Sequence, residues 1–197
     1  MHQRLAVTCL FLTSLLYSAS LYAKRPAKIY VAQADVQPAP DSNCQPLIAQ
    51  ATAVLPALLS ASGKVVDKDP QAPTAAKALE TWLKAKRFAG YRIVVRLVRC
   101  ATRLDPPLAG KRYPVQFAEV ASAIDAERVP SGQMALAGTG DAQIGIEVSK
   151  PSARSQAEAL KEALTASLRQ AIERFVRTAL TGKTQPKKRA RKRSRRR

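Results

Sequence analysis

Histidine is almost absent from this chain, since His2 is the only one among 197 residues. His2 falls within a predicted leader at residues 1–23, so the mature chain would have no histidine. This excludes the imidazole base of Ser-His and Cys-His nucleophiles and the usual zinc ligand sets. Gly182-Lys183-Thr184 has the ending of a phosphate-binding loop, but the glycine required five residues earlier is Arg177. We therefore predict no enzyme, no catalytic residue, no metal site and no cofactor. Hydrolysis by carboxylates is the enzymatic alternative left open.

Acidic and aromatic residues are also scarce. The chain has 14 Asp plus Glu against 33 Lys plus Arg, a formal net charge of +19, and aromatics make up 5% of it. The hydrophobic share of 46% is still enough for one core, which must be built mainly from Ala, Val, Leu and Ile. Wholesale disorder is therefore excluded, and the length allows one domain or at most two small ones.

The start of the chain has the layout of a secretory signal peptide. Arg4 lies near the start, an apolar run spans Leu5 to Leu16, and small residues precede Ala23. We predict cleavage after Ala23 and a secreted or periplasmic protein. The alternative is an uncleaved membrane anchor formed by residues 5–23, although Thr, Ser and Tyr side chains weaken such a span.

Cysteine is limited to three residues, and Cys9 falls within the predicted leader. Cleavage would leave Cys44 and Cys100, an even pair in an oxidising compartment, which favours a disulfide over two free thiols. Such a bond would close the loop from residue 44 to residue 100 and stabilise the fold by about 4 kcal/mol on the chain-entropy model.

The first part of the body predicts a strand and a helix. Apolar and β-branched residues predict a strand over Lys28–Val36, followed by a loop rich in proline and small polar residues. Apolar residues at helical spacing predict a helix over Pro46–Ser62. Pro56 removes a backbone donor and should kink or split this helix near Ala53–Leu55.

A short strand and a second helix should follow. The strand is predicted at Lys64–Asp67, and the helix at Thr74–Ala89, with Thr74 as its cap and Gly90 as its stop. Between them, Asp67-Lys68-Asp69 could offer two carboxylates to a divalent cation. A solvated turn is favoured, because Lys68 lowers the negative potential.

Three further segments predict strands. Tyr91–Thr102 alternates apolar residues with a mixed face that carries Arg92 and Arg96. Arg112–Ile124 is the next strand, with Pro114 suited to its beginning or to a sheet edge, and a turn follows at residues 130–132. The third is Met134–Ser149.

Met134–Ser149 has the sharpest alternation, with apolar residues at even positions. Gly138 and Gly140 interrupt this apolar face, which predicts a bend, a bulge or two strands joined there. A phosphate nest at residues 138–141 is the alternative. The pattern predicts one buried and one wet face, as in an antiparallel sheet.

The last regular segment is a long amphipathic helix over Ser155–Leu180. Ser155 and Glu158 match a capping box, and Gly182 should end the helix. The order of elements predicts an α+β fold with a mixed, largely antiparallel sheet, helices packed on one face and a long C-terminal helix.

This element order resembles small periplasmic α/β domains, namely the amino-terminal domain of the TolB translocation protein and lipoprotein activators of penicillin-binding proteins. Tyr91–Ala179 is also similar to the carboxyl-terminal region of secreted myxobacterial proteins described as HEAT-repeat proteins. The likeness covers most of Lys28–Leu180 and lies in element order, without a diagnostic motif. It implies an envelope protein that works by binding, and it transfers no functional residue.

The end of the chain, Lys183–Arg197, holds ten basic residues and no acid. We expect it to be disordered until it meets a polyanion, because its like charges repel and it lacks apolar residues. Its arginines can pair bidentately with phosphate or carboxylate. The predicted anion-binding residues are Lys187, Lys188, Arg189, Arg191, Lys192, Arg193, Arg195, Arg196 and Arg197.

We interpret the chain as a signal peptide at 1–23, a single α+β domain at 24–182 and a polybasic tail at 183–197. The leading hypothesis is an exported, non-enzymatic binding or structural protein of the bacterial cell envelope, whose tail holds lipopolysaccharide, acidic lipid or wall polymer. The alternatives are a sequence-nonspecific nucleic-acid-binding protein and a cell-wall hydrolase that uses carboxylates. A merely solubilising tail is the bland alternative, and no small-molecule substrate is evident.

The intact mass of the natively produced protein tests the leader and the disulfide together. Export with cleavage after Ala23 should leave Lys24–Arg197, lighter by two hydrogens for the bond between Cys44 and Cys100. Mass spectrometry without reduction measures both. A mass that includes residues 1–23 would instead favour the anchor or a protein that never leaves the cytoplasm.

Overall fold

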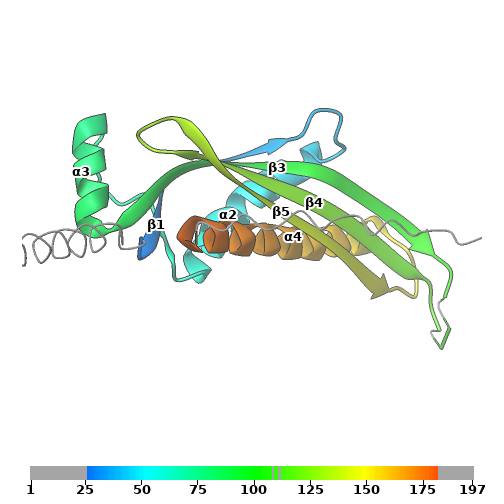
Figure 1. The fold of residues 1–197 in the computed structure, drawn as a ribbon. Helices are drawn as coiled ribbons and strands as arrows, with labels where there is room; N and C mark the ends of the chain where they lie inside the picture. The colour runs from blue at the N-terminus through cyan, green and yellow to red at the C-terminus, as the bar shows by residue number, and fades with distance from the viewer. Residues whose placement is uncertain (1–25, 108, 111, 182–197) are drawn as a thin grey trace, which may run out of the picture.

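The structure is a computed structural model that describes residues 26–107, 109–110 and 112–181. The predicted leader and the predicted tail both lie outside these residues. Figure 1 shows a curved sheet with two helices along its inner face and a third helix standing at one end. The elements are β1 (Lys28–Pro38), η1 (Gln45–Leu47, a 3-10 helix), α2 (Ile48–Ala61), β2 (Val65–Asp67), α3 (Ala76–Lys86), β3 (Phe88–Asp105), β4 (Val115–Arg128), β5 (Gln133–Glu147) and α4 (Ala153–Thr181).

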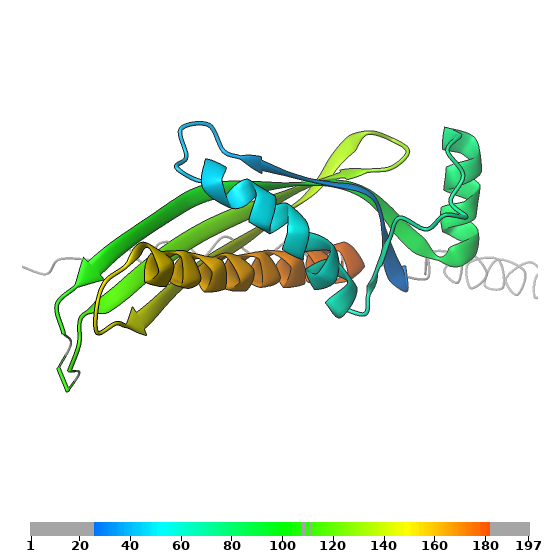
Figure 2. The ribbon, with the colours of Figure 1, turned by 180° about the vertical axis from the view of Figure 1, so that it is seen from behind.

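The strands of the described chain form one mixed sheet in the order β2-β1-β3-β4-β5. β1 runs parallel to β2 and β3, whereas β3, β4 and β5 pair antiparallel. α2 and α4 cover the same face, and α3 stands beyond the end of the sheet (Figures 1 and 2). The predicted α+β class, with its mixed sheet and long final helix, is confirmed.

The core lies between the inner face of the sheet and α4. This helix approaches β5 so closely that only glycine fits beneath it. A Cβ at Gly140 would lie 1.9 Å from the Ser167 carbonyl oxygen, and a Cβ at Gly138 would lie 2.9 Å from the carbonyl oxygen of Ala171. The buried stripe of α4 includes Leu164, Leu168, Ala171, Ile172 and Phe175.

Side chains of α4 also pair with the edge strand β5. The Asp141 backbone N–H donates to Gln170 Oε1 at 2.8 Å, and Arg174 Nη1 donates to the Thr139 carbonyl oxygen at 2.8 Å. These bonds occupy backbone groups that an edge strand leaves without a strand partner. They anchor the helix along the edge of the sheet.

The prediction that the strand bulges or divides at Gly138 and Gly140 is wrong. β5 runs through both glycines, and its register shift lies between the partners of Ala126 and Glu127. The two glycines admit the helix instead of breaking the strand. The alternative of a phosphate nest is not supported either, because the Asp141 N–H is already used by Gln170.

The predicted split at Pro56 is also absent. α2 is continuous from Ile48 to Ala61 with Pro56 inside it. Pro56 and Thr52, whose carbonyl loses its helical partner, are both on the exposed side of the helix. Water can therefore satisfy the freed carbonyl, and the helix tolerates the proline.

The helix predicted at Thr74–Ala89 is shorter, because α3 ends at Lys86. Thr74 is not its cap: the residue before α3 is Ala75, whose side chain makes no capping bond. Arg87 has a left-handed φ of 58° and turns the chain. Phe88, Ala89 and Gly90 then pair with the start of β1, so Gly90 lies within a strand instead of stopping a helix.

The cap of the last helix lies three residues before the predicted one. The Ser155 N–H donates to Ser152 Oγ at 3.1 Å, so the Ser152 side chain caps α4. Glu158, predicted as the partner of Ser155 in a capping box, pairs with Arg154 at 3.2 Å instead.

The predicted disulfide is present between Cys44 and Cys100, whose Cα atoms lie 5.2 Å apart. Cys44 is fully buried immediately before η1, and Cys100 lies within β3. The bond therefore ties the loop after β1 to the neighbouring long strand, across a sequence separation of 56 residues.

The close approach of α4 to β5 predicts a strong effect of a single methyl group. Gly140→Ala should lower the free energy of unfolding by about 3 kcal/mol, because the new Cβ meets the Ser167 backbone, which cannot move without the helix. Denaturant unfolding measures this loss. The control is Gly145→Ala, whose Cβ would meet the Phe117 ring, a side chain that can rotate. Equal losses in both variants would contradict the explanation.

Candidate anion-binding end

The tail residues predicted to bind anions, 187–197, lie outside the described residues, and their contacts stay a prediction. The described chain shows where the tail begins. α4 ends at Thr181 at the same end of the fold that holds Pro26 and α3 (Figures 1 and 2). We call this region the α3 end. The described chain therefore begins and ends at one end of the molecule.

A hollow of about 680 Å³ opens at the α3 end, between α3 and the turn that joins β4 to β5. This volume lies within the range of small-molecule sites. The floor and walls are mostly apolar, and the polar lining consists of charged side chains. The apolar lining comprises Pro26, Leu83, Phe88, Ala89, Gly90, Val129 and Pro130.

Backbone contacts around Gly90 build the hollow. A Cβ on Gly90 would lie 2.7 Å from Leu83 Cδ1 and 2.8 Å from Val129 Cγ2, so glycine lets both side chains reach the strand. The Val129 N–H donates to the Gly90 carbonyl at 3.1 Å, and the Ala27 N–H donates to the Arg87 carbonyl at 2.9 Å. Residues 26–27, 83–90 and 128–130 are thereby held around the same apolar floor.

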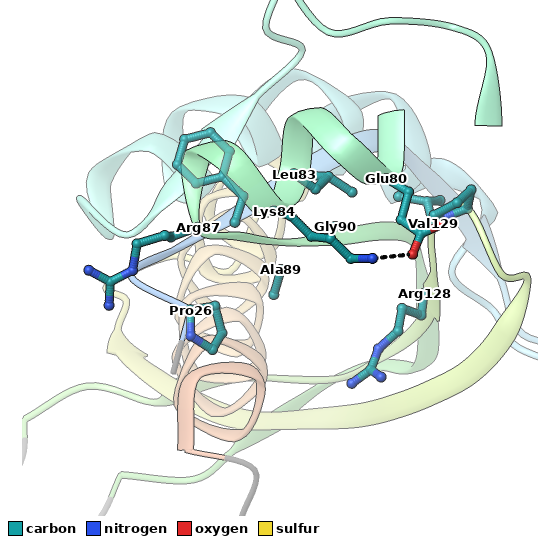
Figure 3. Close-up of a pocket in the computed structure, with 11 residues that line it drawn as sticks. Pro26, Glu80, Leu83, Lys84, Arg87, Ala89, Gly90, Arg128 and Val129 are labelled. Atoms are coloured by element: carbon teal, nitrogen blue, oxygen red, sulfur yellow. Dashed lines mark hydrogen bonds and ion pairs between the residues drawn. The ribbon is translucent and has the colours of Figure 1, made fainter. Parts of the chain in front are cut away.

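Three cations and one carboxylate line this hollow, namely Lys84, Arg87, Arg128 and Glu80. Lys84 Nζ and Glu80 Oε1 lie 2.7 Å apart, and the hydrogen bond from Lys84 lowers the pKa of Glu80. Figure 3 shows the Lys84 ammonium directed toward Glu80, the Arg128 side chain apart from this pair, and the Arg87 guanidinium directed outward. Arg128 is exposed, and its guanidinium has no ion-pair partner within the described part of the chain.

An aromatic cluster supports the floor from below. Trp82 lies edge-on to Tyr30 at 5.2 Å between ring centroids and edge-on to Phe88 at 5.6 Å. Phe88 lines the hollow, so Trp82, the single tryptophan of the chain, contacts a lining residue without lining the hollow itself. Burial raises the pKa of Tyr30, and the negative charges of Asp69 and Asp67 raise it further.

The outer face of the sheet carries a second group of basic side chains, which acidic side chains neutralise. A register shift between Leu97 and Arg99 brings four arginines of β3 onto the outer face of the sheet, which no helix of the described chain covers. The predicted basic face of this strand is thus longer than Arg92 and Arg96 alone. The carboxylates of β4 neutralise it through the pairs Arg92–Glu127, Arg96–Asp125, Arg99–Glu119 and Arg103–Glu119.

The carboxylates at residues 67–69 form a turn. Asp69 Oδ1 accepts the Gln71 N–H at 2.8 Å, and Lys68 has a left-handed φ of 47°. No group of three or more His, Cys, Asp or Glu side chains placed to hold a metal occurs in residues 26–107, 109–110 and 112–181. None of the helices described is long and apolar enough to cross a membrane.

The hollow was not predicted from the sequence. Leu83 and Phe88 fall within the helix predicted at Thr74–Ala89, Gly90 was its predicted stop, and Val129 falls in no predicted element. The local signal available was Gly90 between an amphipathic helix and a strand, where close backbone approach is one meaning of glycine. Nothing in the sequence placed Pro26 or Val129 beside it.

The raised pKa of Tyr30 predicts a loss of stability at alkaline pH. The unfolded chain releases this phenolic proton near pH 10, before the folded protein does, so the free energy of unfolding falls as pH rises from about 10 through the raised pKa. Tyr30→Phe should lack this part of the decline in urea unfolding measured from pH 8 to 11. Tyr113→Phe, which removes an exposed phenol, is the control. Superimposable profiles for wild type and Tyr30→Phe would contradict the assignment.

The chain matches no family model and no curated protein. Among solved structures, it is similar to a DUF330 protein from Xanthomonas campestris, with 13% identity, a TM-score of 0.43 and coverage of 79% of this chain and 89% of that one. It is also similar to a hypothetical protein from Chlamydia trachomatis, with 13% identity, a TM-score of 0.48 and coverage of 80% of this chain and 100% of that one. A minor lipoprotein from Acinetobacter baumannii has 10% identity and a TM-score of 0.39, with coverage of 82% of this chain and 98% of that one. These are small bacterial proteins, and the finer resemblances to TolB, to the lipoprotein activators and to the myxobacterial proteins stay predictions.

Proposed function

We propose that this chain is an exported, non-enzymatic binding protein of the bacterial envelope, whose polybasic tail holds an anionic envelope component at a membrane surface. The observation that supports this most directly is the common position of Pro26 and Thr181 at the α3 end. A predicted leader or anchor ends three residues before Pro26, and the tail begins shortly after Thr181. The tail therefore follows α4 at the end of the fold where the described chain also begins, and an uncleaved anchor would precede β1 at that same end.

Charge at the α3 end supports the same orientation. Lys84, Lys86 and Arg87 lie in the last turn of α3 and its cap, and Arg128 lies at the end of β4. Lys24 and Arg25 directly precede Pro26 in the sequence. Basic residues near an anionic membrane contribute about 1 kcal/mol each, so a tail of ten such residues would dominate the attraction.

The alternative functions are less well supported. A nucleic-acid-binding protein would use the same tail, but the arginines of the open sheet face are engaged by Glu119, Asp125 and Glu127. A hydrolase needs one carboxyl group that keeps its proton. The three carboxylates of the open sheet face are instead each paired with an arginine of β3.

Removal of residues 187–197 tests the proposal. The truncated protein should unfold at the same denaturant concentration as the full mature chain and should lose most of its binding to vesicles of phosphatidylglycerol and phosphatidylcholine. At 50 mM salt we expect a loss of about 100-fold or more, because several cation–phosphate contacts disappear. Vesicle co-sedimentation measures the loss, and raising the salt to 500 mM should weaken only the full chain.

The matched control keeps residues 187–197 but has their nine basic residues replaced by glutamine, which retains the length and bulk and removes the charge. It should behave like the truncation. Unchanged vesicle binding by either variant would overturn the proposal. Tighter binding of the full chain to double-stranded DNA than to the anionic vesicles at equal salt would favour the nucleic-acid alternative.

A further inference from the structure

The hollow at the α3 end combines an apolar floor with the exposed Arg128 guanidinium, which has no ion-pair partner among the described residues, and we propose that it binds one acidic phospholipid of the membrane. An acyl chain would lie on the floor, and the phosphate would meet Arg128. This inference rests on the proposed function, because it takes the α3 end to face the membrane. It goes further in assigning a discrete ligand site, distinct from the tail.

The charge of the hollow favours an anion. Lys84 already pairs with Glu80, whereas Arg128 is a lining cation that no described side chain neutralises. A guanidinium offers two parallel N–H donors that match two phosphate oxygens. Asp67 and Asp69, whose negative charges act on Tyr30, do not line the hollow. The lining carries three cations and one acid, so its net charge is positive.

The floor favours an acyl chain over a small inorganic anion. Leu83, Ala89 and Val129 present aliphatic carbons there, and Phe88 adds an aromatic ring. Burial of a methylene group contributes about 0.8 kcal/mol, which is roughly a fourfold gain in affinity for each added carbon until the floor is filled. Phosphate alone gains nothing from this surface. A ligand with both an anionic head and an apolar chain uses the whole hollow.

The position of the hollow favours a membrane source for this ligand. Pro26 forms one wall and follows the predicted leader or anchor within three residues. The tail starts from the same end, where the proposed function places an anionic bilayer. A lipid at that surface can therefore reach the hollow without leaving the interface completely.

Trp82 provides a reporter for the site. It is the only tryptophan and contacts Phe88 on the floor. Dihexanoyl phosphatidylglycerol, used as monomer with the full mature chain, should change the Trp82 emission with saturation at one lipid per protein. Dibutanoyl phosphatidylglycerol should bind more weakly, and glycerol phosphate and dihexanoyl phosphatidylcholine should bind at least tenfold more weakly. Calorimetry checks the stoichiometry.

Two variants separate the head from the floor. Arg128→Gln removes the charge, and Ala89→Leu fills the floor without changing charge. Each should weaken dihexanoyl phosphatidylglycerol binding about tenfold or more, since charge-assisted hydrogen bonds and apolar burial each reach that size. Arg154→Gln, an exposed arginine on the first turn of α4, is the matched control and should bind like wild type. Because Arg128 is exposed, its variant should fold normally even if Ala89→Leu does not.

Wild-type affinity in Arg128→Gln would overturn the proposal, as would equal binding of glycerol phosphate and the acyl lipid. This result is independent of the vesicle experiment. Failure of the proposed function appears when loss of the tail leaves vesicle binding unchanged. Failure of the lipid site appears when Arg128→Gln, with the tail intact, leaves binding of the monomeric lipid unchanged.

Discussion

The contact between α4 and the inner face of the sheet determines the rest of this structure. The helix lies directly on β5, where Gly140 leaves room for the Ser167 backbone, and the buried Ser122 and Ser167 hydroxyls lie 2.8 Å apart beneath it. Close packing of this kind tolerates little variation, since interiors are as dense as molecular crystals. Because α4 and α2 use one face, the opposite face must be stabilised in water, and the arginine–carboxylate pairs of β3 and β4 occupy it.

The length and direction of α4 also bring the two ends of the described chain together. The helix runs along the sheet and ends near the start of β1, where Phe175 packs edge-on against Tyr91 at 5.5 Å between centroids. Tyr91 directly follows Gly90 on the floor of the hollow. The last turns of the helix are thus linked to the floor of the hollow by core packing, and the same packing sets where the described chain ends.

Sequence periodicity predicted the elements whose faces are uniform. α4 and β5 were predictable because their apolar stripes are long, and the disulfide was predictable from the leader and an even cysteine pair. The register shift after Leu97 was not predicted, because Val98 fits the mixed face as well as Val94 does. The change of face shows only at Arg99, where the alternation expects an apolar residue. The end of α3 was missed because Arg87 adopts a left-handed conformation that favours glycine. The hollow was missed because Pro26, Gly90 and Val129 are distant in sequence and meet only through strand pairing.

The two proposed sites, the tail and the hollow, should respond differently to salt. Proposed binding by the tail would depend on many charges, so it would weaken as salt screens them beyond the Debye length of about 8 Å at physiological ionic strength. Proposed binding in the hollow would depend partly on the apolar floor formed by Leu83 and Val129, which salt does not weaken. Attachment by the tail would raise the local concentration of lipid at Arg128, so a weak site could still be filled at the membrane. Nonspecific electrostatic attraction by the tail would in this way promote specific binding of one lipid in the hollow.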